Sequence, residues 1–236
     1  MSAAQPAATL PDAATLASAI EAAGHARLPG LLSSAECRSL AALFDATDRF
    51  RSHVVMARHN FGRGEYKYFA EPLPPLVARL REMLYPPLAQ IANRWRERLG
   101  EAGSYPGDHA AYRDRCHAAG QARPTPLLLR YRAGDYNCLH QDLYGEEVFP
   151  LQVTVLLSAP GSDFDGGEFV LTEQRPRMQS RARVVSLARG DAVVFPVRTR
   201  PVAGTRGDYS VNVRHGVSEV HRGERHALGV IFHDAA

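Results

Sequence analysis

The second half of the chain has apolar residues that recur with a period of two, which is typical of β-strands rather than helices. From Thr125 onward, Gly and Asp turns separate the apolar runs, and no stretch of helical period intervenes. Strands are predicted near residues 126–132, 136–140, 149–157, 168–172, 182–188, 191–195, 209–214, 216–221 and 225–232. Many short strands without crossover helices predict two packed antiparallel sheets, as in a sandwich or jelly roll.

The first half of the chain is predicted to supply helices that support these sheets. Helical signals cover residues 12–23, 33–44 and 76–99, and short strands are expected at 53–57 and 66–70. The longest helical pattern contains Pro86 and Pro87, which remove hydrogen bonds, so we expect two helices or one kinked helix there.

The predicted fold class is therefore α+β, mainly β, with a double-stranded β-helix (a cupin-like jelly roll) and N-terminal supporting helices. Residues 1–124 form the helical and hairpin support region, and residues 125–236 form the double-stranded β-helix core. The two regions are expected to fold as one integrated domain, because the helices need the sheet to bury their apolar faces.

Composition narrows the class of protein. The three cysteines, Cys37, Cys116 and Cys138, are too few and too scattered for a disulfide framework or a zinc ribbon, so a cytoplasmic protein is expected. No apolar run is long enough to cross a membrane, and the N-terminus lacks the regions of a signal peptide. A formal charge of +3 does not indicate a strongly basic nucleic-acid binder. Of the 28 cationic residues, Lys67 is the one lysine and the rest are arginines, whose guanidinium groups suit carboxylates and phosphates.

A His-x-Asp sequence, His140-Gln141-Asp142, ends the second predicted strand. In an extended chain, residues i and i+2 point to the same side, so His140 and Asp142 can present one nitrogen and one oxygen to a single metal ion. A further histidine would complete a 2-His-1-carboxylate triad, which leaves coordination positions open on Fe(II). By itself the tripeptide more often marks a loop histidine beside a carboxylate.

Later residues strengthen the metal-site interpretation. His215 is followed by Val217, Gly223 and Arg225, at offsets of +2, +8 and +10. Between the two histidine motifs lie Asp165-Gly166-Gly167-Glu168-Phe169 and Arg189-Gly190-Asp191-Ala192-Val193-Val194-Phe195. In this order, the motifs resemble those of the iron(II)/2-oxoglutarate-dependent dioxygenases, and the resemblance covers most of residues 125–234.

This resemblance implies a ligand set. His140, Asp142 and His215 would bind Fe(II), and the planar guanidinium of Arg225 would bind the far carboxylate of the cosubstrate 2-oxoglutarate. Tyr131 would donate a hydrogen bond to the same carboxylate. Without the resemblance, Arg225 would be interpreted as a solvated residue after a turn, and Tyr131 as a core aromatic.

The resemblance also implies the reaction. Such enzymes use O2 to convert a C–H bond of the substrate to C–OH, and they convert 2-oxoglutarate to succinate and CO2. Ascorbate is the expected reductant, and no catalytic residue beyond the metal ligands is implied. Halogenating relatives lack the carboxylate ligand, so Asp142 favours hydroxylation.

Three other histidines compete with His215 for the third ligand position. His221 has no arginine ten residues on, and it lies next to a predicted turn. His226 and His233 are expected in the last strand, where His233 would support the site or the fold. His215 is therefore the preferred ligand.

Two substrate classes remain open, and nucleic acid is the first. The run from Arg130 through Asp142, together with His215-Gly216-Val217, is similar to the AlkB-type demethylases of alkylated bases, which flip the damaged base into the pocket. The run Arg175–Arg183 would then bind phosphates in DNA repair, or else form a solvated hairpin. Those demethylases carry Asn and Arg where this chain has Leu129 and Ile231, and no nucleotide-recognition lid is identified in residues 50–75.

The second class is a protein side chain or small molecule, because Leu28–Cys37 is similar to the entry helix of the prolyl hydroxylases. The amino-acid sequence of the second half of the chain is most similar to a bacterial group of 2-oxoglutarate/iron oxygenases. A non-catalytic jelly-roll binding protein is the alternative outside the enzymes, and it would not bind Fe(II).

Overall fold

A computed structural model of the protein describes residues 10–143 and 145–236. Within these residues the strands form two antiparallel sheets of eight and six strands. The larger, here the major sheet, runs in the order β1 (Ala26–Leu28), β11 (Ala192–Pro196), β7 (Leu151–Leu156), β14 (Val220–Val230), β5 (Leu127–Arg132), β4 (Glu65–Phe69) and β2 (Phe50–Val55), with β8 (Phe164–Gly166) paired to β14. The minor sheet runs β10 (Arg181–Val185), β9 (Phe169–Gln174), β13 (Gly207–Val217), β6 (Tyr136–His140) and β3 (Gly62–Arg63), with β12 (Thr199–Gly204) paired to β13.

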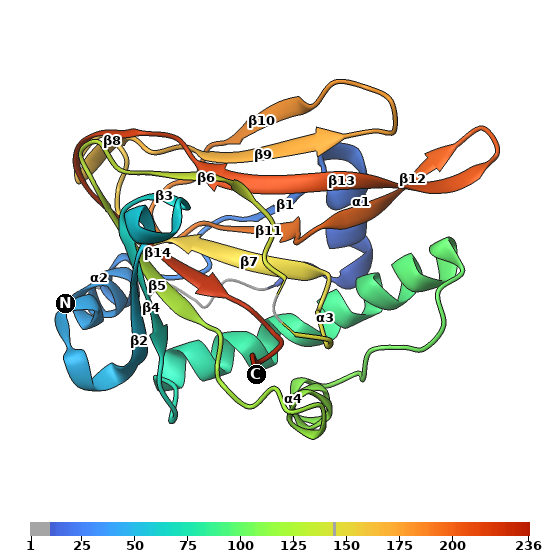
Figure 1. Ribbon diagram of the computed structural model, residues 1–236, viewed down its shortest axis with the longest axis horizontal. Helices are drawn as coiled ribbons and strands as arrows, with labels where there is room; N and C mark the ends of the chain where they lie inside the picture. The colour runs from blue at the N-terminus through green and yellow to red at the C-terminus, as the bar shows by residue number, and fades with distance from the viewer. Residues whose placement is uncertain (1–9, 144) are drawn as a thin grey trace.

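The two sheets form a double-stranded β-helix (Figure 1). From β5 onward the chain passes between the sheets in turn: β5 major, β6 minor, β7 major, β9 and β10 minor, β11 major, β13 minor and β14 major. This alternation confirms the predicted jelly roll and the mainly-β α+β class. Its physical cause is the period-two pattern, which gives each strand one face that must pack on the opposite sheet.

Four helices lie outside the strands within the described residues: α1 (Ala13–Ala23), α2 (Ser34–Ala42), α3 (Pro75–Leu99) and α4 (His109–Ala118). Asp12 caps α1 by accepting from the Thr15 amide at 2.7 Å, and Ser33 and Glu36 form the predicted capping box of α2. Pro86 and Pro87 lie inside α3, which is one helix, so the two-helix alternative is wrong. None of the described helices is long and apolar enough to cross a membrane.

The core has two parts. One part lies between the helices and the outer face of the major sheet, where Leu84 and Leu88 of α3 pack in the same cluster as Val153 and Leu228. The other part lies between the two sheets and includes Tyr131, Phe169 and Phe195. Figure 1 shows α3 along the outer face of the major sheet, so that the inner face alone is left to form a cavity.

The N-terminal segment also contributes strands to the major sheet. β1 pairs with β11, and β4 pairs with β5 from Glu65–Arg130 to Tyr68–Leu127. The division of the chain at residue 124 stays a prediction, and residues 1–9 lie outside the described residues.

Two predicted strand boundaries are wrong. β13 continues through His215 to Val217, where a break after residue 214 was expected, because it keeps its pairing with β9 throughout. β14 is one strand across Gly223, where the sequence predicts a turn between two strands. Gly223 has a φ of +80°, and a Cβ atom there would lie 1.9 Å from the carbonyl oxygen of Asp163, so glycine permits the close approach of β8 rather than a turn.

Candidate functional site

A cavity of about 340 Å³ lies between the inner faces of the two sheets. Its walls come from alternate residues of β4, β5, β7 and β14 in the major sheet and from β6 and β13 in the minor sheet. The lining residues include Tyr66, Tyr131, His140, Asp142, Gln152, Thr154, His215, Arg225 and Ile231. The cavity therefore contains all five residues for which the sequence predicts a binding role.

The structure brings together the triad of His140, Asp142 and His215. His140 ends β6, and its antiparallel partner in β13 is His215, so the two rings face each other with centroids 4.2 Å apart. Asp142 follows two residues beyond His140, with Oδ1 at 3.4 Å from His140 Nε2 and Oδ2 at 3.3 Å from His215 Nε2. One donor atom from each residue lies within 4.8 Å of the other two, which is the spacing of ligands around one metal ion.

Hydrogen bonds orient the members of this triad. His140 Nδ1 lies 2.8 Å from the carbonyl oxygen of Cys138, and the neutral tautomer that donates to this oxygen has its lone pair on Nε2, where it could bind a metal ion. Gln141, between the two ligands, donates from Nε2 to the carbonyls of Arg198 and Val213 at 3.0 and 2.8 Å. The loop that carries Asp142 is thereby fixed to β13.

The electrostatics of the triad favour a carboxylate at Asp142 and a neutral imidazole at His215. Asp142 is buried, and although burial opposes its charge, the hydrogen bonds and charges of the two imidazoles hold its pKa well below the usual range. Burial and the neighbouring His140 lower the pKa of His215. Burial also acts to lower the pKa of His140, but the hydrogen bond and charge of Asp142, together with the backbone of Cys138 and His215, raise that pKa overall. A metal ion would displace the proton from His140, because neutral imidazole and carboxylate are the forms that bind metal.

Two further residues, Arg225 and Tyr131, lie in the same cavity. They are register partners in β14 and β5, and the guanidinium carbon lies 5.5 Å from the centre of the tyrosine ring. Arg225 is 1% exposed, its Nε atom has no hydrogen-bond partner, and no carboxylate of the described residues lies within 4.0 Å of it. The Tyr131 hydroxyl accepts from Asn137 at 3.3 Å, and burial raises the pKa of Tyr131 to about 12, so this hydroxyl is neutral and can donate.

A buried arginine without an anion is unfavourable, because removing a charge from water needs a compensating partner. Burial lowers the pKa of Arg225, as expected for a cation that lacks such a partner. The guanidinium and the Tyr131 hydroxyl are thus suited to bind a carboxylate that enters the cavity. The donor set of the triad fits Fe(II), and this pair fits the far end of a dicarboxylate.

The competing histidines lie outside this triad. His221 is exposed on β14, and the ring of His226 packs against Phe44 with centroids 5.9 Å apart. His233 is buried past the end of β14, not within it as predicted, and its Nδ1 atom accepts from the Phe149 amide at 3.2 Å. The geometry therefore favours His215 over the other three.

The segment 50–75 forms part of the cavity rim. Asn60 and Phe61 follow η3 (Met56–His59) and line the cavity, and the ring of Phe61 is 48% exposed and stacked on His59 at 5.4 Å. β3 pairs this segment with β6, where a Cβ atom on Gly62 would lie 2.4 Å from the carbonyl oxygen of Tyr136. The rim is thus joined directly to the strand that carries His140.

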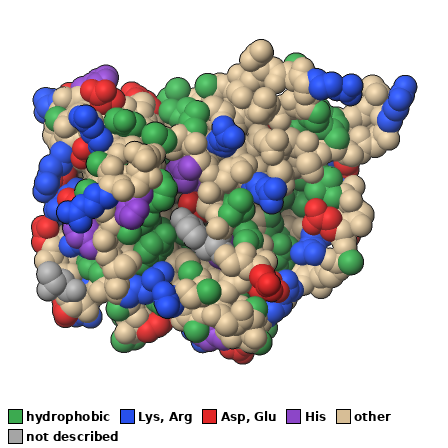
Figure 2. Space-filling model, in the orientation of Figure 1, with side chains coloured by type: hydrophobic (Ala, Val, Ile, Leu, Met, Phe, Trp, Pro, Cys, Tyr) green, Lys and Arg blue, Asp and Glu red, His purple; other side chains and the backbone are tan. Residues whose placement is uncertain are grey.

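The run Arg175–Arg183 forms the hairpin between β9 and β10. Its arginines make no ion pair with any described residue, and several neighbouring arginines share this property. Twelve are both exposed and without an ion pair in the described parts of the chain: Arg38, Arg58, Arg63, Arg94, Arg113, Arg123, Arg175, Arg177, Arg181, Arg198, Arg206 and Arg214. Figure 2 shows Lys and Arg side chains around this face of the molecule and at the protruding hairpin on its upper right.

Sequence reasoning missed the cavity wall formed by β7. Gln152 and Thr154 interrupt the otherwise apolar strand Leu151–Leu156 on alternate positions, and both point into the cavity. Two polar residues with period two in a buried strand are the signal that could have identified them.

Comparisons with known proteins agree with this geometry. The model of the Oxygenase-NA family, described as "Oxygenase, catalysing oxidative methylation of damaged DNA", matches residues 64–235. An uncharacterised protein found in two strains of Mycobacterium tuberculosis is 51% identical over 168 residues, which cover 71% of this chain and 72% of that protein.

Solved structures share the fold at low sequence identity. A prolyl-4-hydroxylase of Pseudomonas putida is 15% identical with a TM-score of 0.53, and the match covers 95% of this chain and all of that one. An oxidoreductase of the 2OG-Fe(II) oxygenase family from Burkholderia pseudomallei is 16% identical with a TM-score of 0.53, over 97% of this chain and 94% of that one. A Trichoplax adhaerens prolyl hydroxylase, solved with a peptide of hypoxia-inducible factor, is 15% identical with a TM-score of 0.56, over 94% and 89%.

Proposed function

Because this chain belongs to the Oxygenase-NA family of oxygenases, we propose that it is an Fe(II)- and 2-oxoglutarate-dependent dioxygenase that acts on alkylated nucleic acid. His140, Asp142 and His215 bind the iron, and Arg225 and Tyr131 bind the far carboxylate of 2-oxoglutarate. One observation carries this proposal: a donor triad with two buried members and a buried arginine without an anion within 4.0 Å share one cavity.

The bound iron supplies the redox chemistry by which O2 oxidises a substrate C–H bond to C–OH while 2-oxoglutarate becomes succinate and CO2. The protein residues hold and orient the reactants. Asp142 and the two imidazoles occupy one side of the metal position, and the cavity on the other side admits cosubstrate and substrate. Arg225 fixes the cosubstrate by its far end, and the buried walls exclude water.

Nucleic acid is the substrate class that the surface supports best. The family description names damaged DNA, and the twelve exposed arginines without ion pairs can bind backbone phosphates. Arg58 and Arg63 flank the rim, where the exposed Phe61 and His59 rings offer a stacking surface for a base. Oxidation of an N-methyl carbon gives a hydroxymethyl group, which leaves as formaldehyde and restores the base.

We also propose that the protein works in a reducing compartment, the cytoplasm. The three cysteines, Cys37, Cys116 and Cys138, are all free, which supports this location.

The test is succinate formation from 2-oxoglutarate with Fe(II), ascorbate and O2. It is run without substrate, with methylated single-stranded DNA, and with a pool of proline-containing peptides. Arg225→Ala and His140→Ala should abolish turnover, whereas Arg222→Ala, which loses an exposed pair with Asp165 and an exposed hydrogen bond to the Gly161 carbonyl, should retain it. Stimulation by methylated DNA supports the proposed substrate class. Stimulation by the peptides instead would make the protein a prolyl hydroxylase, and absence of turnover with intact folding would contradict the enzyme proposal.

A further inference from the structure

The cavity contains a buried amide that the proposed ligand set does not use. Gln152 on β7 is 4% exposed, and its Oε1 atom has no hydrogen-bond partner among residues 10–143 and 145–236. A buried polar atom without a partner destabilises a fold, so its presence in a strand of apolar residues needs a reason. Thr154 lies on the same face of the strand, and both side chains line the cavity.

Gln152 lies at the metal end of this cavity. In the major sheet it is the register partner of Phe195, and paired residues point to the same face. The ring of Phe195 lies 4.7 Å from the ring of His215, which places this part of the sheet opposite the triad. Thr154 pairs with Gly229, and the Leu127 side chain fills the space that a Cβ atom on Gly229 would need, at 2.8 Å.

Arg225 marks the opposite end of the same cavity wall. Val230 pairs with Val153, so Gln152 lies beside Ile231, which follows the end of β14 and stands six positions after Arg225. The side chains of Arg225 and Gln152 both line the cavity, at the two ends of this wall. A cation at one end and an amide at the other suit a dicarboxylate held at both ends.

Apolar side chains form the cavity wall on β5 and past the end of β14: Leu127, Leu129 and Ile231. The hydroxyls of Tyr66 and Tyr68, the register partners of Leu129 and Leu127, line the neighbouring wall on β4. On β7, the residues that can donate are Gln152 and Thr154. An amide can turn its NH₂ group toward a carboxylate by rotating about its last bond, and a threonine hydroxyl can donate as well.

We propose that Gln152, with the hydroxyl of Thr154, binds the carboxylate at the metal end of the 2-oxo acid. This proposal rests on the proposed function for the identity of the cosubstrate. It assigns the two ends of the ligand to different residues: Arg225 and Tyr131 hold the far carboxylate, and Gln152 holds the near one.

The experiment is calorimetric binding to the Mn(II)-loaded protein without O2, so that no turnover is needed. Two ligands are compared: 2-oxoglutarate, and 2-oxobutyrate, which has the metal end but lacks the far carboxylate. Gln152→Leu should weaken the binding of both ligands about 10- to 100-fold, the loss expected for a hydrogen bond to a charged group. Arg225→Met should weaken only 2-oxoglutarate, to about the affinity of 2-oxobutyrate.

Two further readouts separate ligand binding from a structural role. Ligand-free Gln152→Leu should melt at the same temperature as the wild type or higher, because it removes an unpartnered buried amide. Gln152→Asn keeps the amide but shortens its reach, and it should also weaken binding. Gln174→Leu, which changes an exposed glutamine outside the cavity, should change 2-oxoglutarate affinity less than twofold.

Several outcomes would overturn the assignment. Gln152→Leu affinity within twofold of the wild type would show that the amide does not contact the cosubstrate. A lowered melting temperature or failure to fold in Gln152→Leu would show a structural role. If the wild type itself bound no 2-oxo acid, the proposed function would fail as well, whereas binding that depends on Arg225 and not on Gln152 would refute this inference alone.

Discussion

Arg225→Met is predicted to make the ligand-free protein more stable, although it removes the residue proposed to bind 2-oxoglutarate. Arg225 is 1% exposed and has no carboxylate within 4.0 Å among the described residues. Its compensation is two aromatic rings, Tyr131 at 5.5 Å and Phe164 at 5.9 Å, and the charge of Glu168 beyond 4.0 Å. A ring–cation contact contributes about 0.5–2 kcal/mol, and replacing a buried charge by an apolar side chain of similar size gains up to about 4 kcal/mol.

The balance of these terms is a gain of about 1 kcal/mol, because the cavity beside the guanidinium reduces the desolvation that is relieved. For a chain of 236 residues this corresponds to a rise in Tm of about 2–4 °C. The same substitution should remove the increase in Tm that 2-oxoglutarate gives the Mn(II)-loaded wild type, since the far carboxylate loses its cation.

Arg81 is the matched control. It is equally buried, at 1% exposed, but it donates to the Phe232 carbonyl and to Asp234 Oδ1, both at 2.8 Å. Arg81→Met leaves the Asp234 carboxylate buried, with His117 at 3.0 Å as its remaining ion-pair partner among the described residues. Loss of one partner of a buried pair costs about 3–5 kcal/mol, so Tm should fall by at least about 6 °C.

The assay is thermal unfolding of the two variants and the wild type, each with and without 2-oxoglutarate. Opposite shifts in the ligand-free proteins would show that one buried arginine supports the fold and the other awaits a ligand. If Arg225→Met lowered Tm as much as Arg81→Met does, Arg225 would be a structural residue, and the reasoning about an uncompensated cation would be refuted.

Three further predictions concern the surroundings of the site. Burial and the nearby Arg81 lower the pKa of His109 to about 4, so the unfolded chain binds a proton below about pH 6.5 that the folded chain excludes. The contribution of His109 to the free energy of unfolding is therefore complete above that pH and is lost as the pH falls toward 4. His109→Gln should flatten the pH dependence of the free energy of unfolding in urea, and an unchanged pH dependence would contradict this. Gly62→Ala places a Cβ atom 2.4 Å from the Tyr136 carbonyl oxygen at a φ of +125°, so it should lower the free energy of unfolding by about 2 kcal/mol, and a change within 0.5 kcal/mol by urea titration would refute it. Gln141→Leu removes both hydrogen bonds that fix the Asp142 loop and should weaken Fe(II) binding about 10-fold in a chelator competition, whereas unchanged affinity would show that the loop is held otherwise.

The sequence pattern predicts the core strands well, because their period-two apolar runs are bounded by turns. It misses β12, whose stretch contains Pro201 and Gly204, residues that argue against a strand. Since β12 pairs only with β13, it is an edge strand, and an edge strand tolerates a proline that cannot donate to a second neighbour. Pairing, which decides this, is a long-range property that local pattern does not contain.

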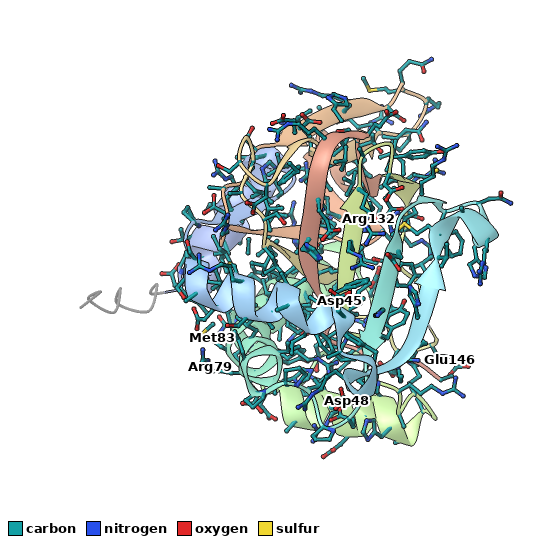
Figure 3. All side chains as sticks on the ribbon, turned by 90° about the vertical axis from the view of Figure 1, so that its left-hand side faces the viewer. Asp45, Asp48, Arg79, Met83, Arg132 and Glu146 are labelled. Carbon is teal, nitrogen blue, oxygen red and sulfur yellow. The ribbon has the colours of Figure 1, made fainter. Side chains whose placement is uncertain are left out.

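The site residues that have a characteristic spacing along the chain are predicted from the sequence. His140 and Asp142 share a strand face, and His215 and Arg225 follow in a fixed order. Gln152 is not predicted from the sequence. Its position near the triad depends on how β7 packs opposite β13, with Phe195 between them. The surface arginines illustrate the same limit: in Figure 3, Arg132 lies on β5, where it pairs with Glu224 at 3.0 Å, while the arginines near the rim have no such partner.

The most direct test of the metal centre is Fe(II) binding without O2, measured as iron retained per chain and as affinity. The wild type should bind one Fe(II), and His140→Ala, Asp142→Ala and His215→Ala should each abolish it. His221→Ala, which changes an exposed histidine outside the triad, should bind as the wild type does. Retention of Fe(II) by His215→Ala, or its loss in His221→Ala, would contradict the assignment of the triad as the metal centre.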